Sequence, residues 1–233
     1  YMNIFGSYKN LTFTLSVAFV CLYFANLSLA FISYQVNDRI FTYEKEKYFL
    51  RIAKNMEQTR LLKENEVKKR LMKENEVKRK TLNVLSKYRT GLNPVQLRQT
   101  ARVIHQEGKK FGYDPMFLVA LIVTESSAYN WAVSNVGARG LMQLMPFTAE
   151  EIASETALQW KGKKTLYDPL LNIKMGTYYL GKMESKFGNL QLALEAYNQG
   201  PKRLNKMLNR GYLPTRYSNK VFSAYERIKQ GRI

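Results

Sequence analysis

The first hydrophobic feature of the chain is an uncharged stretch that begins after Lys9 and ends before Asp38. Within it, residues 11–33 are rich in Phe, Leu, Val and Ala. About 20 consecutive apolar residues are enough for a helix to cross the hydrocarbon core of a bilayer. The pattern therefore predicts a transmembrane helix, and we assign residues 1–36 to an N-terminal membrane anchor.

A cleaved signal peptide is the alternative to this anchor. Residues 28–30, Ser-Leu-Ala, resemble a small-residue cleavage site that follows a basic start and an apolar run. We favour the uncleaved anchor because the apolar stretch continues through Phe31 and Ile32 and is long for the core of a signal peptide. Both interpretations export the rest of the chain. The basic residues around the span fix its direction only weakly.

Charged residues dominate the next segment, in which the apolar positions do not keep one helical period. Residues 38–89 contain no Pro and no Gly, and a near-duplicate decapeptide, LLKENEVKKR then LMKENEVKRK, fills residues 61–80. Ten residues advance a helix by about 1000°, so the repeat rotates its apolar stripe instead of stacking it. We expect residues 37–90 to form a charged helical stalk. The stalk is either a solvated helix or a helix that pairs. A pairing helix would form a coiled coil with a second copy of the chain or would bind an envelope partner.

Helix-start and helix-stop signals are dense in residues 91–233. A capping residue precedes a proline at residues 93–94, 114–115 and 168–169. Thr148 with Glu151 fits a capping box, and Gly112, Gly188 and Gly200 fit helix stops. No run shows convincing period-two alternation. The chain is therefore expected to be mainly α, with a domain boundary near Gly91.

Composition narrows the classes of partner. The formal net charge of +19 favours polyanions, which include nucleic acid, anionic lipid headgroups and an acidic cell wall. The sequence has no recognition-helix, zinc-finger or aromatic RNA-binding signature, so we expect no nucleic-acid partner. One cysteine, Cys21, and one histidine, His105, argue against a disulfide framework and against metal catalysis. We expect no metal, no cofactor and a structural role for His105.

Glu125 is the residue on which the chemistry depends. It follows Met116–Val123, which is apolar on every side and predicts a buried helix, and it shares a face with Leu118 and Ile122. Burial first, and the negative end of the helix second, should raise its pKa. A carboxyl that stays protonated near neutral pH suits general-acid cleavage of a glycosidic bond. The alternative is a glutamate that reaches solvent at a helix end.

Other glutamates are interpreted more simply. We expect solvated helix charges at Glu150, Glu151, Glu155 and Glu195. Tyr178, next to Tyr179, could enter a groove, but the sequence does not decide this.

Three motifs in order resemble those of a known family. Glu125-Ser126, GARGLMQLMP at 137–146 and AYNQG at 196–200 are similar to the successive motifs of the soluble-type lytic transglycosylase catalytic domain, a relative of goose-type lysozyme. The resemblance covers about residues 93–228. It implies a lysozyme-like α-helical catalytic domain in residues 91–233 that acts on peptidoglycan glycan strands and requires no cofactor.

The resemblance also implies roles for particular residues. Glu125 matches the family's catalytic glutamate. The positions that match substrate-binding residues are Ser134, Met142, Gln143, Tyr197, Asn198 and Tyr217. Tyr217 is expected to orient the glutamate, although its neighbourhood Pro-Thr-Arg-Tyr departs from the family's Thr-Arg-Asn-Tyr form. Core packing is the alternative for Met142 and Tyr197.

No second catalytic carboxylate is apparent, whereas most glycosidases use two. The resemblance implies that Glu125 protonates the leaving oxygen of the MurNAc-GlcNAc bond and then deprotonates the C6 hydroxyl of the same muramic sugar, which leaves a 1,6-anhydro end. We expect the chain at the bacterial inner (cytoplasmic) membrane with the catalytic domain facing the periplasm or cell wall. The alternatives are a lysozyme-type hydrolase and a non-catalytic peptidoglycan-binding scaffold.

Overall fold

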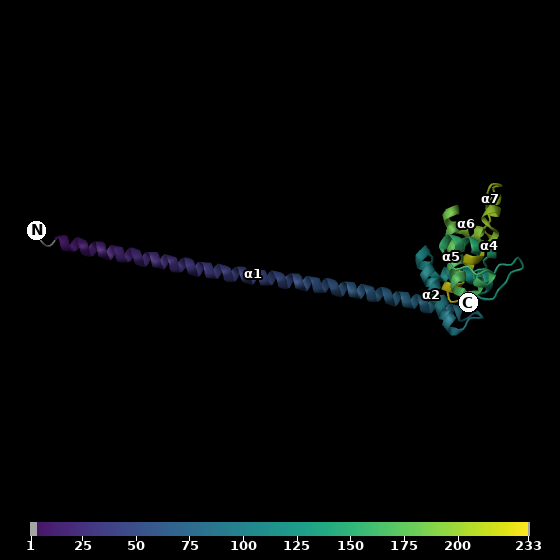
Figure 1. The fold of residues 1–233 in the computed structure, drawn as a ribbon, viewed down its shortest axis with the longest axis horizontal. Coiled ribbons are helices and arrows are strands. Elements are labelled where there is room, and N and C mark those ends of the chain that lie inside the picture. Colours follow the sequence, from purple (N-terminus) through teal and green to yellow (C-terminus); the bar gives the residue numbers. More distant parts are fainter. Residues whose placement is uncertain (1–3, 233) are drawn as a thin grey trace. The chain divides into compact units, whose positions relative to one another are not determined.

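The computed structural model describes residues 4–232 (Figure 1), and within them the side chains of residues 16–232. The first three residues of the expected anchor, and Ile233 at the end of the catalytic segment, lie outside the described residues. In the described range the regular elements are helices, accompanied by isolated β-bridges that pair Arg139 with Val133 and with Leu144. The expectation of a mainly α chain is confirmed.

The first helix, α1 (Ile4–Leu85), runs without interruption through the segments expected to be anchor and stalk. From Ser16 onwards it contains a window that is long and apolar enough to cross a membrane, with a mean hydropathy of 1.9 and none of its surface buried inside the protein. A core helix of a soluble protein would bury such a window. The absence of Pro and Gly between residues 38 and 89 explains why the helix does not break after the apolar part.

The chain divides into two compact units, residues 1–69 and residues 70–233. The second unit begins well before the boundary expected near Gly91, because the end of α1 contributes to its core. Thr81 and Leu85 are fully buried there, and Leu82 packs against the same core. These residues were expected to belong to the stalk, since a few apolar positions among charged ones do not reveal which of them is covered.

The second unit is a bundle of helices (Figure 1), and one apolar helix lies in its core. Its elements after α1 are α2 (Pro94–Phe111), α3 (Pro115–Ser126), α4 (Pro146–Thr156), the 3₁₀-helix η1 (Lys163–Tyr167), α5 (Pro169–Phe187), α6 (Leu190–Gln199), α7 (Pro201–Leu208) and α8 (Arg216–Lys229). Residues 118–122 of α3 are completely buried, and α3 packs against α2 and α8. The prediction of a buried helix before Glu125 is confirmed.

Capping side chains start three of these helices, α2, α3 and α5, where the sequence predicted. Asn93 accepts the N–H groups of Val95 and Gln96, and the Gln96 side chain completes a capping box. Asp114 caps α3 by accepting the N–H of Met116, and Asp168 caps α5 by accepting two N–H groups of its first turn. The predicted stops at Gly112, Gly188 and Gly200 are also present.

The capping box predicted at Thr148 and Glu151 is wrong. Helix α4 begins at Pro146, with Met145 as its N-cap, so Thr148 already lies inside the first turn. Proline at the first helical position sets this earlier start, because its φ angle is helical and it lacks an N–H that would need a partner.

Candidate functional site

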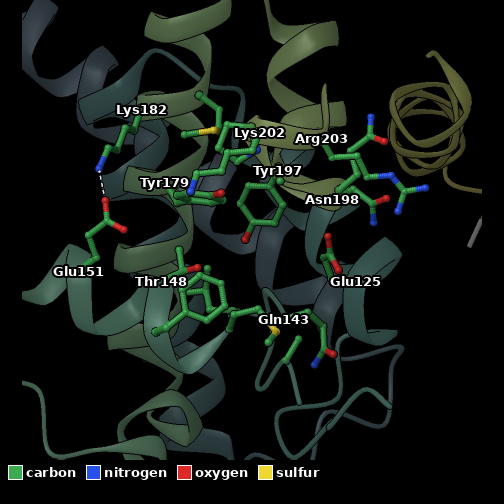
Figure 2. A pocket seen from close by; sticks show the side chains of 18 of the residues that line it. Glu125, Gln143, Thr148, Glu151, Tyr179, Lys182, Tyr197, Asn198, Lys202 and Arg203 are labelled. Atoms are coloured by element: carbon green, nitrogen blue, oxygen red, sulfur yellow. Dashed lines mark hydrogen bonds and ion pairs between the residues drawn. The ribbon is translucent and has the colours of Figure 1, made fainter. Parts of the chain in front are cut away.

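A cavity of about 1220 Å³ opens in the second unit between α3, the loop that precedes α4, and helices α4 to α7 (Figure 2). Five of the residues singled out from the sequence line it, and these are Glu125, Ser134, Gln143, Tyr197 and Asn198. Figure 2 shows Glu125 and Gln143 on one side of the cavity and Tyr197 and Asn198 on another. Folding therefore brings together motifs that are far apart in the sequence.

Glu125 lies in the last turn of α3 and is mostly buried. Burial raises the pKa of its carboxyl from 4.5 to about 7, while a hydrogen bond from Tyr217 and the charge of Lys220 oppose the rise. The predicted direction and its main cause, burial, are confirmed. At neutral pH the protonated and ionised forms of this carboxyl are therefore both well populated.

Tyr217, near the start of α8, donates its phenolic hydrogen to the Oε1 atom of Glu125. Burial, followed by the proximity of Glu125, raises the pKa of Tyr217 well above its ordinary value, so the phenol stays neutral and remains a donor. Tyr217 does not line the cavity itself. Its phenol contacts Glu125 from outside the cavity wall.

Tyr197 is buried on α6 and donates its phenolic hydrogen to the backbone oxygen of Met142 at 2.8 Å. This bond joins α6 to the loop of the second motif. Burial raises the pKa of Tyr197 well above its ordinary value, so this phenol is neutral as well. Its ring lies 5.3 Å from the ring of Tyr179, centre to centre.

Met142 is fully buried and is absent from the cavity wall. Its backbone N–H donates to Oδ1 of Asn172 at 2.8 Å. Its side chain packs on α5 at Gly176, where an added Cβ would lie 2.5 Å from the Met142 sulfur. The side chain of Met142 therefore contacts the core and not the cavity, as the packing alternative describes.

Gln143 adopts a left-handed backbone with φ of 46°. Its Nε2 atom donates to the backbone oxygens of Gly140 at 2.9 Å and Ala132 at 3.2 Å. Because the amide nitrogen is used inside the loop, the amide oxygen is the atom left for a ligand. Ser134 accepts the N–H of Ala138 through its hydroxyl oxygen at 3.0 Å, which leaves the hydroxyl hydrogen for a ligand.

Several lining residues were not expected from the sequence. Val136 and Phe147 are large apolar side chains that are 76% and 67% exposed on the cavity wall. Tyr179 lines the cavity, whereas its neighbour Tyr178 donates to Glu155 at 3.0 Å. No sequence signal separates these residues from core positions, because a helix or loop residue that is apolar is usually buried.

Charged residues occupy another part of the cavity wall. Lys182 lies 2.8 Å from Glu151 and 2.5 Å from Glu155, and its ion pair with Glu151 is drawn in Figure 2. Lys186, Lys202 and Arg203 also line the cavity, and none of them forms an ion pair within the described part of the chain. The helices of this wall therefore present net positive charge.

The expectation of solvated charges holds for Glu150, Glu151 and Glu155, which are exposed. It is wrong for Glu195, which is only 3% exposed. Glu195 accepts hydrogen bonds from the N–H and the hydroxyl of Ser218. Its place in the sequence gives no sign of this, because the partner lies in another helix.

Metal ligands are not gathered anywhere in the described part of the chain, where no three His, Cys, Asp or Glu side chains form a cluster. His105 is half-buried on α2, and burial lowers its pKa.

A family profile described as Transglycosylase SLT domain matches residues 102–218, just over half of the chain. The soluble lytic murein transglycosylase of Salmonella typhimurium is 41% identical over 90 residues, which are 37% of this chain and 14% of the relative. The membrane-bound lytic murein transglycosylase E of Buchnera aphidicola is 32% identical over 107 residues, 45% of this chain and 50% of the relative. The chain thus spans half or less of the length of these curated relatives.

Among solved structures, an inactive Glu-to-Gln mutant of the lytic transglycosylase Slt from Pseudomonas aeruginosa is similar to this chain. The two superpose with a TM-score of 0.50 and 30% sequence identity, over 56% of this chain and 24% of the other.

Proposed function

Because the chain belongs to the transglycosylase SLT domain family, we propose that it is a peptidoglycan lytic transglycosylase that cleaves the MurNAc-GlcNAc bond without water. The observation that supports this most strongly is one carboxyl in the cavity, Glu125, with a pKa of about 7 and a hydrogen bond from Tyr217. Such a group is able to donate a proton and then accept one at neutral pH.

In the first step, protonated Glu125 gives its proton to the glycosidic oxygen that leaves. The carboxylate that forms is stabilised by the Tyr217 phenol and by the nearby charge of Lys220. Both groups favour the ionised form more than the neutral one, so they stabilise charge that develops during bond cleavage.

The second step uses the substrate's own hydroxyl. The other carboxylate on the cavity wall is Glu151, and its Oε1 atom lies 2.8 Å from the ammonium of Lys182. Glu151 is exposed and paired, which does not suit it as a buried nucleophile. We therefore assign cation stabilisation to the N-acetyl carbonyl of the muramic sugar, and the base role to Glu125, which takes the proton from the C6 hydroxyl as the 1,6-anhydro ring closes.

Polar groups around Glu125 would bind the sugar. The amide oxygen of Gln143, the hydroxyl of Ser134 and the exposed amide of Asn198 face the cavity, where they suit hydroxyl and N-acetyl substituents. The apolar side chains of Val136 and Phe147 offer surface for the faces of sugar rings. Met142 is left out of this binding set because its side chain is in the core.

Support for a single essential glutamate also comes from a relative. The Pseudomonas aeruginosa lytic transglycosylase Slt was solved as an inactive mutant in which one glutamate is replaced by glutamine.

Helix α1 supports a proposal for the location of the chain. We place its apolar part in the bacterial inner membrane and the second unit on the periplasmic or cell-wall side, where peptidoglycan lies. The exposed apolar window and the membrane-bound relative from Buchnera aphidicola support this. A carbonate wash should leave the full-length chain in the membrane. Recovery of a soluble form that begins near Phe31 would instead support a cleaved signal peptide.

The nature of the product tests the function. Purified peptidoglycan digested with the full chain in detergent should release muropeptides with 1,6-anhydro-muramic ends, and digestion in heavy-oxygen water should leave those ends unlabelled. Glu125→Gln is the matched control and should release nothing. Reducing ends that carry the label would indicate a lysozyme-type hydrolase. Binding to the wall without any release would indicate a scaffold.

A further inference from the structure

Glu195 is a buried carboxylate that the proposed chemistry does not use. It lies on α6, and one of its oxygens, Oε1, is 2.8 Å from the backbone nitrogen of Ser218 and 3.0 Å from the Ser218 hydroxyl. Ser218 is completely buried. A carboxylate is costly to bury without such partners, so this pair of contacts accounts for its presence in the core.

The contact occurs at the start of α8. The N-cap residue, Thr215, makes no side-chain hydrogen bond to the first turn, and Ser218 is the third residue of the helix. The first N–H groups of a helix have no partner within it, and they favour a negative charge nearby. Glu195 therefore supplies from α6 the cap that α8 lacks in its own sequence.

Tyr217 is the residue next to Ser218, and its phenol contacts Glu125. Fixing the backbone at Ser218 fixes the point from which the Tyr217 side chain extends. Helix α8 packs against both α3, which carries Glu125, and α6, which carries Glu195. The charge of Glu195 is also close enough to raise the pKa of Tyr217, after burial and the larger effect of Glu125.

We propose that Glu195 is a positioning residue, which caps α8 from α6 and thereby holds the Tyr217 phenol against Glu125. The catalytic meaning of this contact rests on the proposed function, whereas the geometric statement does not. Glu195 does not line the cavity and is not assigned any contact with substrate.

The groups that face Glu125 give this proposal a direct readout. Tyr217 and Lys220 both lie in the first turns of α8, and both lower the pKa of Glu125, while the neutral phenol of Tyr197 faces it from α6. If the start of α8 shifts, Glu125 loses the two groups that favour its ionised form. Its pKa should then rise further.

The test is a carbon-13 NMR titration of glutamate carboxyls in the full chain, with the Glu125 signal assigned by its loss in Glu125→Gln. Glu195→Ala should move the Glu125 midpoint to higher pH, and Tyr217→Phe should move it in the same direction. In the double variant, Glu195→Ala should add much less to the shift than it does alone, because the two residues act through one contact. An additive shift, or an unchanged midpoint in folded Glu195→Ala, overturns the proposal.

Conservative variants separate positioning from general damage. Glu195→Gln keeps an oxygen that accepts the Ser218 N–H, so the midpoint should stay near that of the wild type. Ser218→Ala removes only the hydroxyl and should also have a small effect. If Glu195→Ala does not fold, Glu195→Asp replaces it. Its shorter side chain reaches Ser218 less well, so the midpoint should again rise, and an unchanged midpoint overturns the proposal.

Activity provides the second readout. Glu195→Ala should lower kcat/KM on peptidoglycan by about 10- to 100-fold, as for a displaced catalytic contact, and should move the alkaline limb of the pH profile upward. A loss of stability alone would not move that limb. If the wild type is inactive but the NMR shifts occur, the proposed function fails and the positioning role stands. If the wild type is active but the variants show no NMR shift, the proposed function stands and the positioning role fails.

Discussion

Asn172 on α5 accepts the backbone N–H of Met142 at 2.8 Å and donates from Nδ2 to the backbone oxygens of Arg139 and Leu166, each at 3.0 Å. The side chain is completely buried. One amide thus satisfies three backbone groups of the loop that carries Gln143 and of the segment before α5. The wall of the cavity depends on this residue, although no substrate would touch it.

Replacing Asn172 with alanine should lower the free energy of unfolding by about 2 kcal/mol or more. The Met142 N–H and the Leu166 oxygen would each lose a partner, at a cost of roughly 1 to 3 kcal/mol per group, whereas the Arg139 oxygen would keep the N–H of Leu144. Urea denaturation would measure the change. Asn219→Ala, on the exposed surface of α8, is the control and should have little effect. A loss below about 1 kcal/mol for Asn172→Ala would mean that water replaces the amide.

Glu125→Gln should separate stability from activity. The folded-state pKa of about 7 lies above the ordinary value of 4.5, so the unfolded state ionises first as pH rises. The contribution of Glu125 to the free energy of unfolding is present below pH 4.5 and is lost as pH rises through 7. Relative to the wild type, the variant should gain up to about 3 kcal/mol between pH 4 and pH 8.

Thermal or urea unfolding across this pH range would measure that gain, and turnover should be abolished throughout. A variant that is strongly destabilised at pH 8 would show that Glu125 is an ion-pair partner and not a group held in its neutral form.

The end of α1 should be required for stability. Leu85 is 1% exposed in the core of the second unit, whereas Leu71 on the same helix is 52% exposed. Leu85→Ala should cost about 2 to 5 kcal/mol, and Leu71→Ala should cost almost nothing. We expect residues 70–233 to fold and a fragment of residues 92–233 to be less stable, although the sequence alone places the domain boundary near Gly91.

Circular dichroism melts of the two fragments would compare them directly. Equal melting temperatures would mean that the last turns of α1 pack on the second unit without stabilising it, and would return the boundary to Gly91.

The unpaired cations of the cavity should contribute to binding and not to chemistry. Peptide stems of peptidoglycan carry carboxylates, and Lys202 and Arg203 line the cavity without an ion pair in the described part of the chain. Arg203→Gln should raise KM with little change in kcat, and the salt dependence of KM should become weaker. Arg210→Gln, exposed and outside the cavity, is the control. An equal fall in kcat would mean that Arg203 acts in the transition state.

The parts of this fold that were predictable are those with local causes. Asn93, Asp114 and Asp168 start helices because cap and proline are adjacent in the chain, and the apolar residues before Glu125 indicate a buried helix, where burial raises the pKa of its carboxyl. These features need no knowledge of distant contacts.

The features of the fold and the site that the sequence did not predict depend on partners in other helices. Glu195 has the pattern of a surface glutamate until α8 places Ser218 against it. Leu85 has the pattern of a stalk residue until the core covers it. The family motifs indicated the position of Met142, but its side chain faces Gly176 and not the cavity.

The packing of Met142 on Gly176 sets how closely the loop of the second motif approaches α5. A Cβ at position 176 would meet the Met142 sulfur at 2.5 Å and its Cβ at 2.8 Å, so a larger residue there requires Met142 or α5 to shift. Gln143 would move with Met142. The position of one cavity wall is therefore set from behind, by the absence of a side chain at residue 176, and not by the residues that line the cavity.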